Sequence, residues 1–156
     1  MGFALHNRGA GFTLDPAHPN VLAGGKRPFH TIIPGFMERG AQHIGFGIMG
    51  GPNQPLAHAQ FVSNVVDYGM NLQQALEAPR FTKSGPAGCD VLIESRVPRA
   101  ALEGLTERGH EVTVAREYTQ QMGRGQAILY DSDTGTNYAA SDPRADGAAT
   151  PEPIVT

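Results

Sequence analysis

Hydrophobic and polar positions follow two different periods along this chain, and the period changes at a pair of glycines. Residues 42–50, QHIGFGIMG, form an apolar run that is typical of a strand. Residues 55–69 place Phe61 and three valines on one helical stripe, which predicts an amphipathic helix that ends at Gly69. Gly50 and Gly51 lie between the two elements, where the strand must turn into the helix.

The same signals predict the remaining elements. A short helix at 71–79 has Asn71 as its N-cap and stops at Pro79. A strand at 31–38 and the strand at 42–50 flank the turn ERGAQ, as in a hairpin. The other predicted elements are strands at 2–7, 90–95 and 110–117, a helix at 98–109, and a hairpin over 123–144 with DSDTGT as its turn.

This order predicts an α+β fold, a largely antiparallel sheet covered by helices. We expect residues 1–144 to form the folded portion and residues 145–156, which are small, polar and rich in proline, to form a flexible tail. The first predicted strand begins without any lead-in, which suggests that the sheet belongs to a larger one.

Composition narrows the class of protein. With 156 residues, 40% hydrophobic and 17% charged, the chain is typical of one globular domain. The net charge of -3 and the scattered Lys and Arg give no reason to expect nucleic acid, and no apolar run approaches the roughly 20 residues of a membrane span. Cys89 is the one cysteine, so an intrachain disulfide is impossible. The N-terminus lacks the pattern of a signal peptide, and the cellular compartment is left open.

Few residues suggest chemistry. No pair of histidines has metal-ligand spacing, and we find no nucleotide-binding or nucleophile-elbow motif, so we expect no metal and no cofactor. Gly50 and Gly51 are different, because two backbone N–H groups at a strand end before a helix can form an oxyanion site or a plain tight turn. His30 and Thr31, at the start of the neighbouring predicted strand, would lie at the same end of the sheet.

Four stretches carry a resemblance to a known family. In order, GKRPFHTIIP, GIMGG, VVDYGMNLQQALEAPRF and YAASDPRADGAA resemble the C-terminal part of the small subunit of the gamma-glutamyltransferase (gamma-glutamyltranspeptidase) family. The resemblance runs from about residue 2 to residue 149. It implies part of an N-terminal nucleophile hydrolase with a four-layer αββα sandwich. In that family the precursor cuts itself, and the newly exposed threonine becomes the nucleophile with its own amine as base. Gly50 and Gly51 fall on the family's oxyanion-hole glycines.

The chain departs from the family pattern in two respects. No threonine, including Thr13, Thr31 and Thr82, has the context of the nucleophile, so we expect no hydrolase activity from this polypeptide alone. The substrate pocket differs as well, because the resemblance places Gly11 where glutamate-binding members have an acid and Arg8 where Gln or Glu is common. His30 and Thr31 replace the serine pair that contacts the glutamyl carboxylate.

These changes favour an acyl group that ends in a carboxylate over one that carries an ammonium group. The alternative for Arg8 is a loop arginine that points to solvent.

Two functions are consistent with the sequence. The first is the C-terminal portion of a gamma-glutamyltransferase-like amidohydrolase or acyltransferase, which contributes the oxyanion hole and part of the acyl pocket. Its partners would be the missing large-subunit segment of the same precursor and a small gamma-glutamyl or related acyl amide, with neither nucleic acid nor membrane. The alternative is a non-catalytic fragment or paralogue that pairs with a partner chain or binds a ligand. Association into a homo-oligomer is left open.

Overall fold

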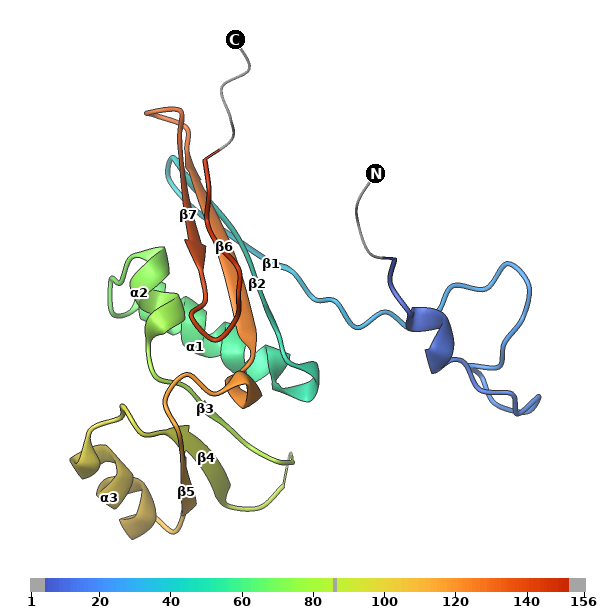
Figure 1. Cartoon of the computed structure of the whole chain (residues 1–156), viewed down its shortest axis with the longest axis horizontal. Coiled ribbons are helices and arrows are strands. Elements are labelled where there is room, and N and C mark those ends of the chain that lie inside the picture. Colours follow the sequence, from blue (N-terminus) through green and yellow to red (C-terminus); the bar gives the residue numbers. More distant parts are fainter. Residues whose placement is uncertain (1–4, 86, 152–156) are drawn as a thin grey trace. The chain divides into compact units, whose positions relative to one another are not determined.

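The computed structural model describes residues 5–85 and 87–151, which group into two compact units. The N-terminal unit comprises Met1–Ile32 and the main unit comprises Ile33–Thr156. Figure 1 shows the helices and strands of each unit. We describe each unit by itself.

The N-terminal unit consists mostly of loop. Its one helical turn in the described part is η1, a 3₁₀ helix at Arg8–Gly11, and a single parallel bridge joins Thr13 to Val21. The side-chain amide of Asn20 donates to the carbonyl of Gly11 at 2.8 Å and ties the loop to η1. The strand predicted at 2–7 is wrong for residues 5–7, which form no strand, and residues 2–4 lie outside the described residues. Residues 5–7 pair with no strand of the described chain, and the Leu5 side chain is 86% exposed.

The main unit contains an antiparallel four-stranded sheet in the order β1-β2-β6-β7. Helices α1 and α2 cover one face of it (Figure 1). The strands of this sheet are β1 (Gly35–Arg39), β2 (Gln42–Met49), β6 (Arg124–Asp131) and β7 (Thr136–Ser141). The predicted hairpin of β6 and β7 and its turn are confirmed.

A second, three-stranded sheet lies beyond α2 in the chain, in the order β3-β4-β5. Its strands are β3 (Phe81–Thr82), β4 (Asp90–Glu94) and β5 (Glu111–Ala115), and helix α3 (Arg99–Glu107) connects β4 to β5 in parallel. The structure therefore corrects the expectation of one sheet, although α+β with mostly antiparallel pairing is confirmed. Strand β3 was not predicted, because two residues are too few to show a period.

Strand β1 is shorter than predicted and this changes the position of two candidate residues. The prediction was 31–38, whereas β1 begins at Gly35 opposite Phe46 of β2. The next rung of the ladder would involve Pro34, which has no N–H to donate. His30 and Thr31 therefore precede the strand and are not part of the β1–β2 hairpin.

The helices of the main unit begin and end where local chemistry allows. Helix α1 spans Gln54–Val66, and Gly69 follows with a left-handed φ of 65°. Helix α2 spans Leu72–Glu77, and Asn71 is its N-cap as predicted, because the Asn71 side chain accepts from the Gln74 N–H while Gln74 binds back to the Asn71 N–H. No helix in the described part of the chain is long and apolar enough to cross a membrane.

The hydrophobic core lies between the four-stranded sheet and α1 and α2. The ring of Phe61 on α1 is completely buried and lies 4.8 Å from the ring of Phe46 on β2. Gly35 has no side chain for a structural reason, since a Cβ there would lie 2.3 Å from the Phe46 ring. The buried apolar residues of this core are Ile44, Ile48, Ala57, Phe61, Leu72, Ala75, Leu76, Ala127 and Ala140.

A buried network of two arginines and two carboxylates lies beside this core. Arg144 makes a two-point contact with Glu94, with Nε to Oε1 at 2.8 Å and Nη2 to Oε2 at 2.6 Å. Asp142 lies between the guanidinium groups, at 3.0 Å from Arg144 Nη1 and 2.7 Å from Arg80 Nη2. Each of these four side chains is 2% exposed or less. We call this set the ion network; it joins the end of β7 to β4 of the other sheet.

Glu94 stays ionised inside the protein because its partners are strong. Burial alone would raise its pKa, but hydrogen bonds and charge from Arg144, with the N–H of Arg80, outweigh burial and hold the pKa of Glu94 below its ordinary value. Removing the Glu94 carboxylate would leave each of these donors without its acceptor, and this would lower the stability of the folded protein.

We predict that Glu94→Gln lowers the free energy of unfolding by about 3–5 kcal/mol, the cost of breaking a buried ion pair. The matched control is Glu103→Gln, which removes a carboxylate 2.7 Å from Arg99 on the surface of α3. That change should cost about 0.5 kcal/mol or less. Urea unfolding of the two variants measures the difference, and equal losses would contradict a structural role for the ion network.

His58 on α1 forms a second polar link within the main unit. Its Nε2 accepts the backbone N–H of Ile48 in β2 at 2.9 Å, and its ring packs edge-on to Phe46 at 5.3 Å. A protonated imidazole cannot accept a hydrogen bond. Burial lowers the pKa of His58 below its ordinary value of 6.5, which keeps the ring neutral.

We predict that His58 makes stability depend on pH. The unfolded chain takes up the proton at the ordinary value of 6.5 while the folded chain resists it, so the contribution of His58 is complete above 6.5 and is lost as the pH falls through the lowered pKa. Urea unfolding between about pH 8 and about pH 5 should show this loss for the wild type. His58→Gln, whose amide oxygen can still accept, should lose less stability over the same range. Parallel profiles for the two proteins would rule the effect out.

Candidate active site

The glycine pair forms the sharp turn between β2 and α1. Met49 ends β2, a short 3₁₀ helix η2 (Gly51–Asn53) follows, and α1 begins at Gln54. Gly51 has a left-handed φ of 59°, a conformation that glycine adopts without strain. The sequence placed a strand-to-helix turn here, and the structure confirms it.

The N–H groups of Gly50 and Gly51 take part in no hydrogen bond of the described chain. Within the described chain, the hydrogen bonds that tie the turn together use carbonyl groups: the N–H of Asn53 donates to Gly50 O at 3.2 Å, and Gln54 Nε2 donates to Gly51 O at 3.3 Å. None of these bonds uses the N–H of Gly50 or Gly51. Free N–H groups at the start of a helix are suited to a carbonyl oxygen that gains negative charge.

The backbone of a second segment, which contains Gly123, packs against the glycine turn. A Cβ on Gly50 would lie 3.2 Å from the Cα of Gly123, and a Cβ on Gly123 would lie 2.7 Å from the carbonyl oxygen of Met49. Gly123 also has a left-handed φ of 83°. The two backbones pass so closely that a side chain at Gly123 would overlap Met49, and one at Gly50 would make a tight contact with Gly123.

The ion network fixes this supporting segment. Arg80 Nη1 donates to the carbonyl groups of Met122 and Gly123, each at 3.3 Å. Asp142 Oδ2 accepts the N–H of Gly125 at 2.9 Å. The buried charges therefore hold the segment on which the glycine turn lies. In the sequence, Arg80 and Arg144 lie in the stretches APRF and SDPR. These stretches contributed to the family resemblance, but nothing in them indicated that the arginines support the glycine turn.

Three of the proposed substrate-binding residues meet in the N-terminal unit. Arg8, Gly11 and Thr31 line one cavity of about 380 Å³, together with Asn7, Ala10, Asn20 and Phe29. Arg8 Nη1 donates to Asn7 Oδ1 at 3.0 Å, its Nε is buried without a hydrogen-bond partner, and no carboxylate in the described residues pairs with it. The guanidinium therefore keeps capacity for a carboxylate.

His30, the fourth proposed residue, does not line that cavity. Its Nδ1 accepts the N–H of Ile32 at 3.3 Å, and its ring lies 5.8 Å from the ring of His6. The four residues belong to the N-terminal unit, whereas Gly50 and Gly51 belong to the main unit. The expected proximity of His30 and Thr31 to the glycine turn therefore stays a prediction. Among the described residues, no group of three or more His, Cys, Asp or Glu side chains could hold a metal ion.

Comparison with known proteins gives a consistent result. The family profile described as Gamma-glutamyltranspeptidase matches residues 1–152. Over 152 residues the chain is 36% identical to the glutathione hydrolase-like YwrD proenzyme of Bacillus subtilis and 35% identical to the oxamate amidohydrolase proenzyme of Klebsiella pneumoniae. Each match covers 95% of this chain and 29% of the relative, so the chain spans less than a third of the length of these proteins.

Solved structures agree with the sequence matches. The crystal structure of cephalosporin acylase from Bacillus halodurans superimposes with a TM-score of 0.73 at 43% identity, and the match covers 94% of this chain and 27% of that one. The chain thus has the mixed α+β fold of the N-terminal nucleophile hydrolases, of which it is a portion. From the sequence match over residues 1–152 and the shared fold, this chain belongs to the gamma-glutamyltranspeptidase family.

Proposed function

We propose that this chain is the C-terminal portion of an N-terminal nucleophile amidohydrolase or acyltransferase and that it supplies the oxyanion hole. Gly50 and Gly51 would donate their N–H groups to the substrate's carbonyl oxygen as it becomes an oxyanion. The observation that carries this proposal is the turn itself, because no hydrogen bond in the described chain uses the N–H of Gly50 or Gly51, and the backbone of Gly123 packs closely against Gly50. Donors that are fixed before the reaction need no reorganisation when charge develops.

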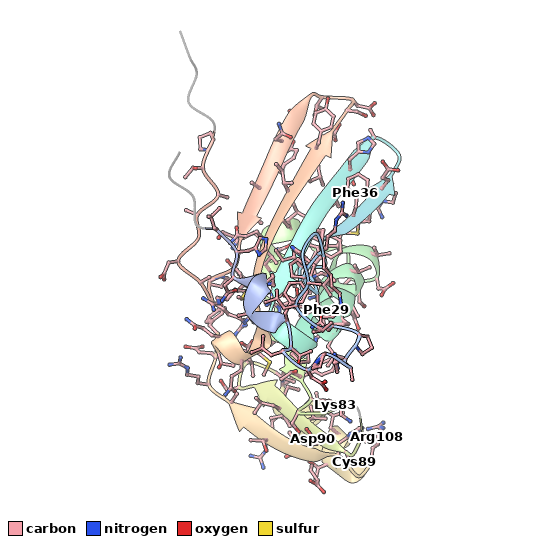
Figure 2. The ribbon with its side chains drawn as sticks, turned by 90° about the vertical axis from the view of Figure 1, so that its right-hand side faces the viewer. Phe29, Phe36, Lys83, Cys89, Asp90 and Arg108 are labelled. Carbon is pink, nitrogen blue, oxygen red and sulfur yellow. The ribbon has the colours of Figure 1, made fainter. Side chains whose placement is uncertain are left out.

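The nucleophile in this proposal is a threonine on another part of the same precursor. The face of the four-stranded sheet opposite α1 and α2 supports a partner of this kind, since no described residue of the main unit is known to cover it. Phe36, Gly45, Ile128 and Ala139 form one row across that face, and Phe36 and Ile128 are 67% and 49% exposed. Figure 2 shows Phe36 on β1. A sheet with helices on one face and apolar side chains on the other is half of a sandwich.

The second candidate function is a non-catalytic module that only pairs with such a partner. The same exposed row is compatible with it, since sheet packing alone would bury these side chains. The glycine turn favours the catalytic function over the non-catalytic module. A module that only pairs with a partner has no need for unused N–H groups held against the Gly123 segment.

The acyl group is the finer part of the proposal. Arg8 would bind a carboxylate at the end of the acyl chain through a two-point contact, and Gly11 offers no acid to an ammonium group. We therefore propose a dicarboxylic acyl group such as glutaryl, with Thr31 of the same cavity near its carboxylate.

We predict that Gly123→Ala lowers kcat in the complete, processed enzyme by about 10²-fold, the effect of misplacing one oxyanion donor. The added methyl group would meet the carbonyl oxygen of Met49 at 2.7 Å and displace the glycine turn. Turnover of a chromogenic acyl anilide measures the loss, with KM changed little.

Gly135→Ala is the matched control for this prediction. Gly135 has a similar φ of 67° in the β6–β7 turn, and nothing lies within 4 Å of an added Cβ. It therefore carries the same backbone strain without touching the glycine turn. Equal kcat for the two variants would leave Gly50 and Gly51 as an ordinary turn and favour the non-catalytic module.

We predict that the complete enzyme cleaves glutaryl amides at least as well as gamma-glutamyl amides. Gly11→Asp should shift the ratio of kcat/KM toward the gamma-glutamyl amide by about tenfold, because an unpaired ammonium group in such a site costs roughly 1–3 kcal/mol. Gly9→Asp is the control: it adds the same charge in η1 at a residue that does not line the cavity. A wild type that strongly prefers the gamma-glutamyl amide, or an equal shift in both variants, would contradict this assignment.

A further inference from the structure

A second cavity, larger than the proposed acyl pocket, adjoins the glycine turn. It measures about 500 Å³ and is bounded by Gly50, Pro52 and Asn53 on one side and by the three-stranded sheet on the other. Its remaining wall residues are Thr82, Lys83, Ser84, Asp90, Val91, Leu92, Thr113 and Gln121. All of them belong to the main unit. None of them has a place in the proposed acyl pocket.

Asn53 is the distinctive polar group of this cavity. It is 8% exposed, and neither its Nδ2 nor its Oδ1 has a hydrogen-bond partner in the described part of the chain. An asparagine that precedes a helix ordinarily caps it, yet the Asn53 side chain makes no capping bond to α1. Its Nδ2 lies 3.7 Å from the position of a Cβ on Gly50. A buried amide with both functions unsatisfied is unfavourable unless something binds it.

The walls around Asn53 combine apolar and polar side chains and carry no net charge. Thr82, Leu92 and Thr113 are neighbours in register, so they present one row to the cavity. Lys83 and Asp90 contribute one charge of each sign, and Figure 2 shows both near the end of the three-stranded sheet. Asp90 is already engaged by Ser84, whose N–H and hydroxyl donate to it at 2.8 Å and 2.5 Å. Such a site suits a neutral polar group better than an anion.

We infer that this cavity binds the amine side of the substrate and that Asn53 pairs there with an amide group. The inference rests on the proposed function, since it places the scissile carbonyl over the glycine turn. The amine portion then continues past Gly50 into the cavity. A carbonyl group of the ligand would accept from Asn53 Nδ2, and an N–H of the ligand would donate to Oδ1. A carboxylate would satisfy Nδ2 alone and leave Oδ1 facing another acceptor. Asn53 is therefore a specificity residue for peptide-like or carboxamide-bearing amines.

Binding can be tested without catalysis. Titration of the ¹⁵N-asparagine-labelled chain with glycinamide should shift the side-chain resonances of Asn53 saturably, whereas ethylamine, which lacks the amide, should not. Asn53→Leu assigns the resonances by removing them. Shifts with neither probe, or equal shifts with both, would overturn the inference.

Specificity is tested in the complete, processed enzyme with two substrates that share one acyl group and differ in the amine, glycinamide or ethylamine. Asn53→Leu should lower kcat/KM about 10- to 100-fold for the glycinamide substrate and leave the ethylamide within about twofold. Asn137→Leu, which removes an exposed amide on β7 outside the cavity, is the control and should change neither substrate by more than about twofold.

The outcomes separate this inference from the proposed function. Equal losses on both substrates would mean that Asn53 only supports the turn, and no loss on either would mean that it binds nothing; each result overturns the inference. A wild type that cleaves neither amide, with glycinamide still shifting Asn53, would reject the proposed reaction and retain the binding site.

Discussion

The two-point contact between Arg144 and Glu94 is the interaction on which the rest of this structure depends. It connects the end of the four-stranded sheet to the middle strand of the other sheet, and Asp142 and Arg80 extend it to the segment beneath the glycine turn. A buried ion pair gives little net stability relative to apolar residues of the same volume, because removing the charges from water is costly. Its value here is geometric, since guanidinium groups bind carbonyl and carboxylate oxygens only in fixed directions.

This arrangement explains how an exposed turn can be stiff. Gly51 is exposed, and nothing lies within 4 Å of the position that a Cβ would take there. The preceding residue, Gly50, packs against Gly123, whose carbonyl accepts a hydrogen bond from Arg80. The ion network therefore supports the turn through Gly123, while Gly51 is exposed.

The sequence predicted the elements whose determinants are local, and these include the helix that begins at Asn71 and the β6–β7 hairpin. It missed features that depend on distant partners. The stretch before Pro34 is apolar enough for a strand, but Ile32 is 57% exposed and the ladder starts only at Gly35. Charged residues are usually at the surface, so nothing local marked Arg80 and Arg144 as buried. The unsatisfied amide of Asn53 likewise became visible only once its surroundings were known.

The contrast between the His58 and Arg144 contacts has a consequence for the order of folding. The bond from Ile48 to His58 spans 10 residues, so β2, the glycine turn and α1 close a small loop with little loss of chain entropy. The bonds of Arg144 to Glu94 and Leu76 span 50 and 68 residues and need almost the whole main unit to be assembled first. We therefore expect the glycine turn to form early in folding and the ion network that supports it to form late. A nascent chain released before residue 144 would carry a formed but unanchored turn.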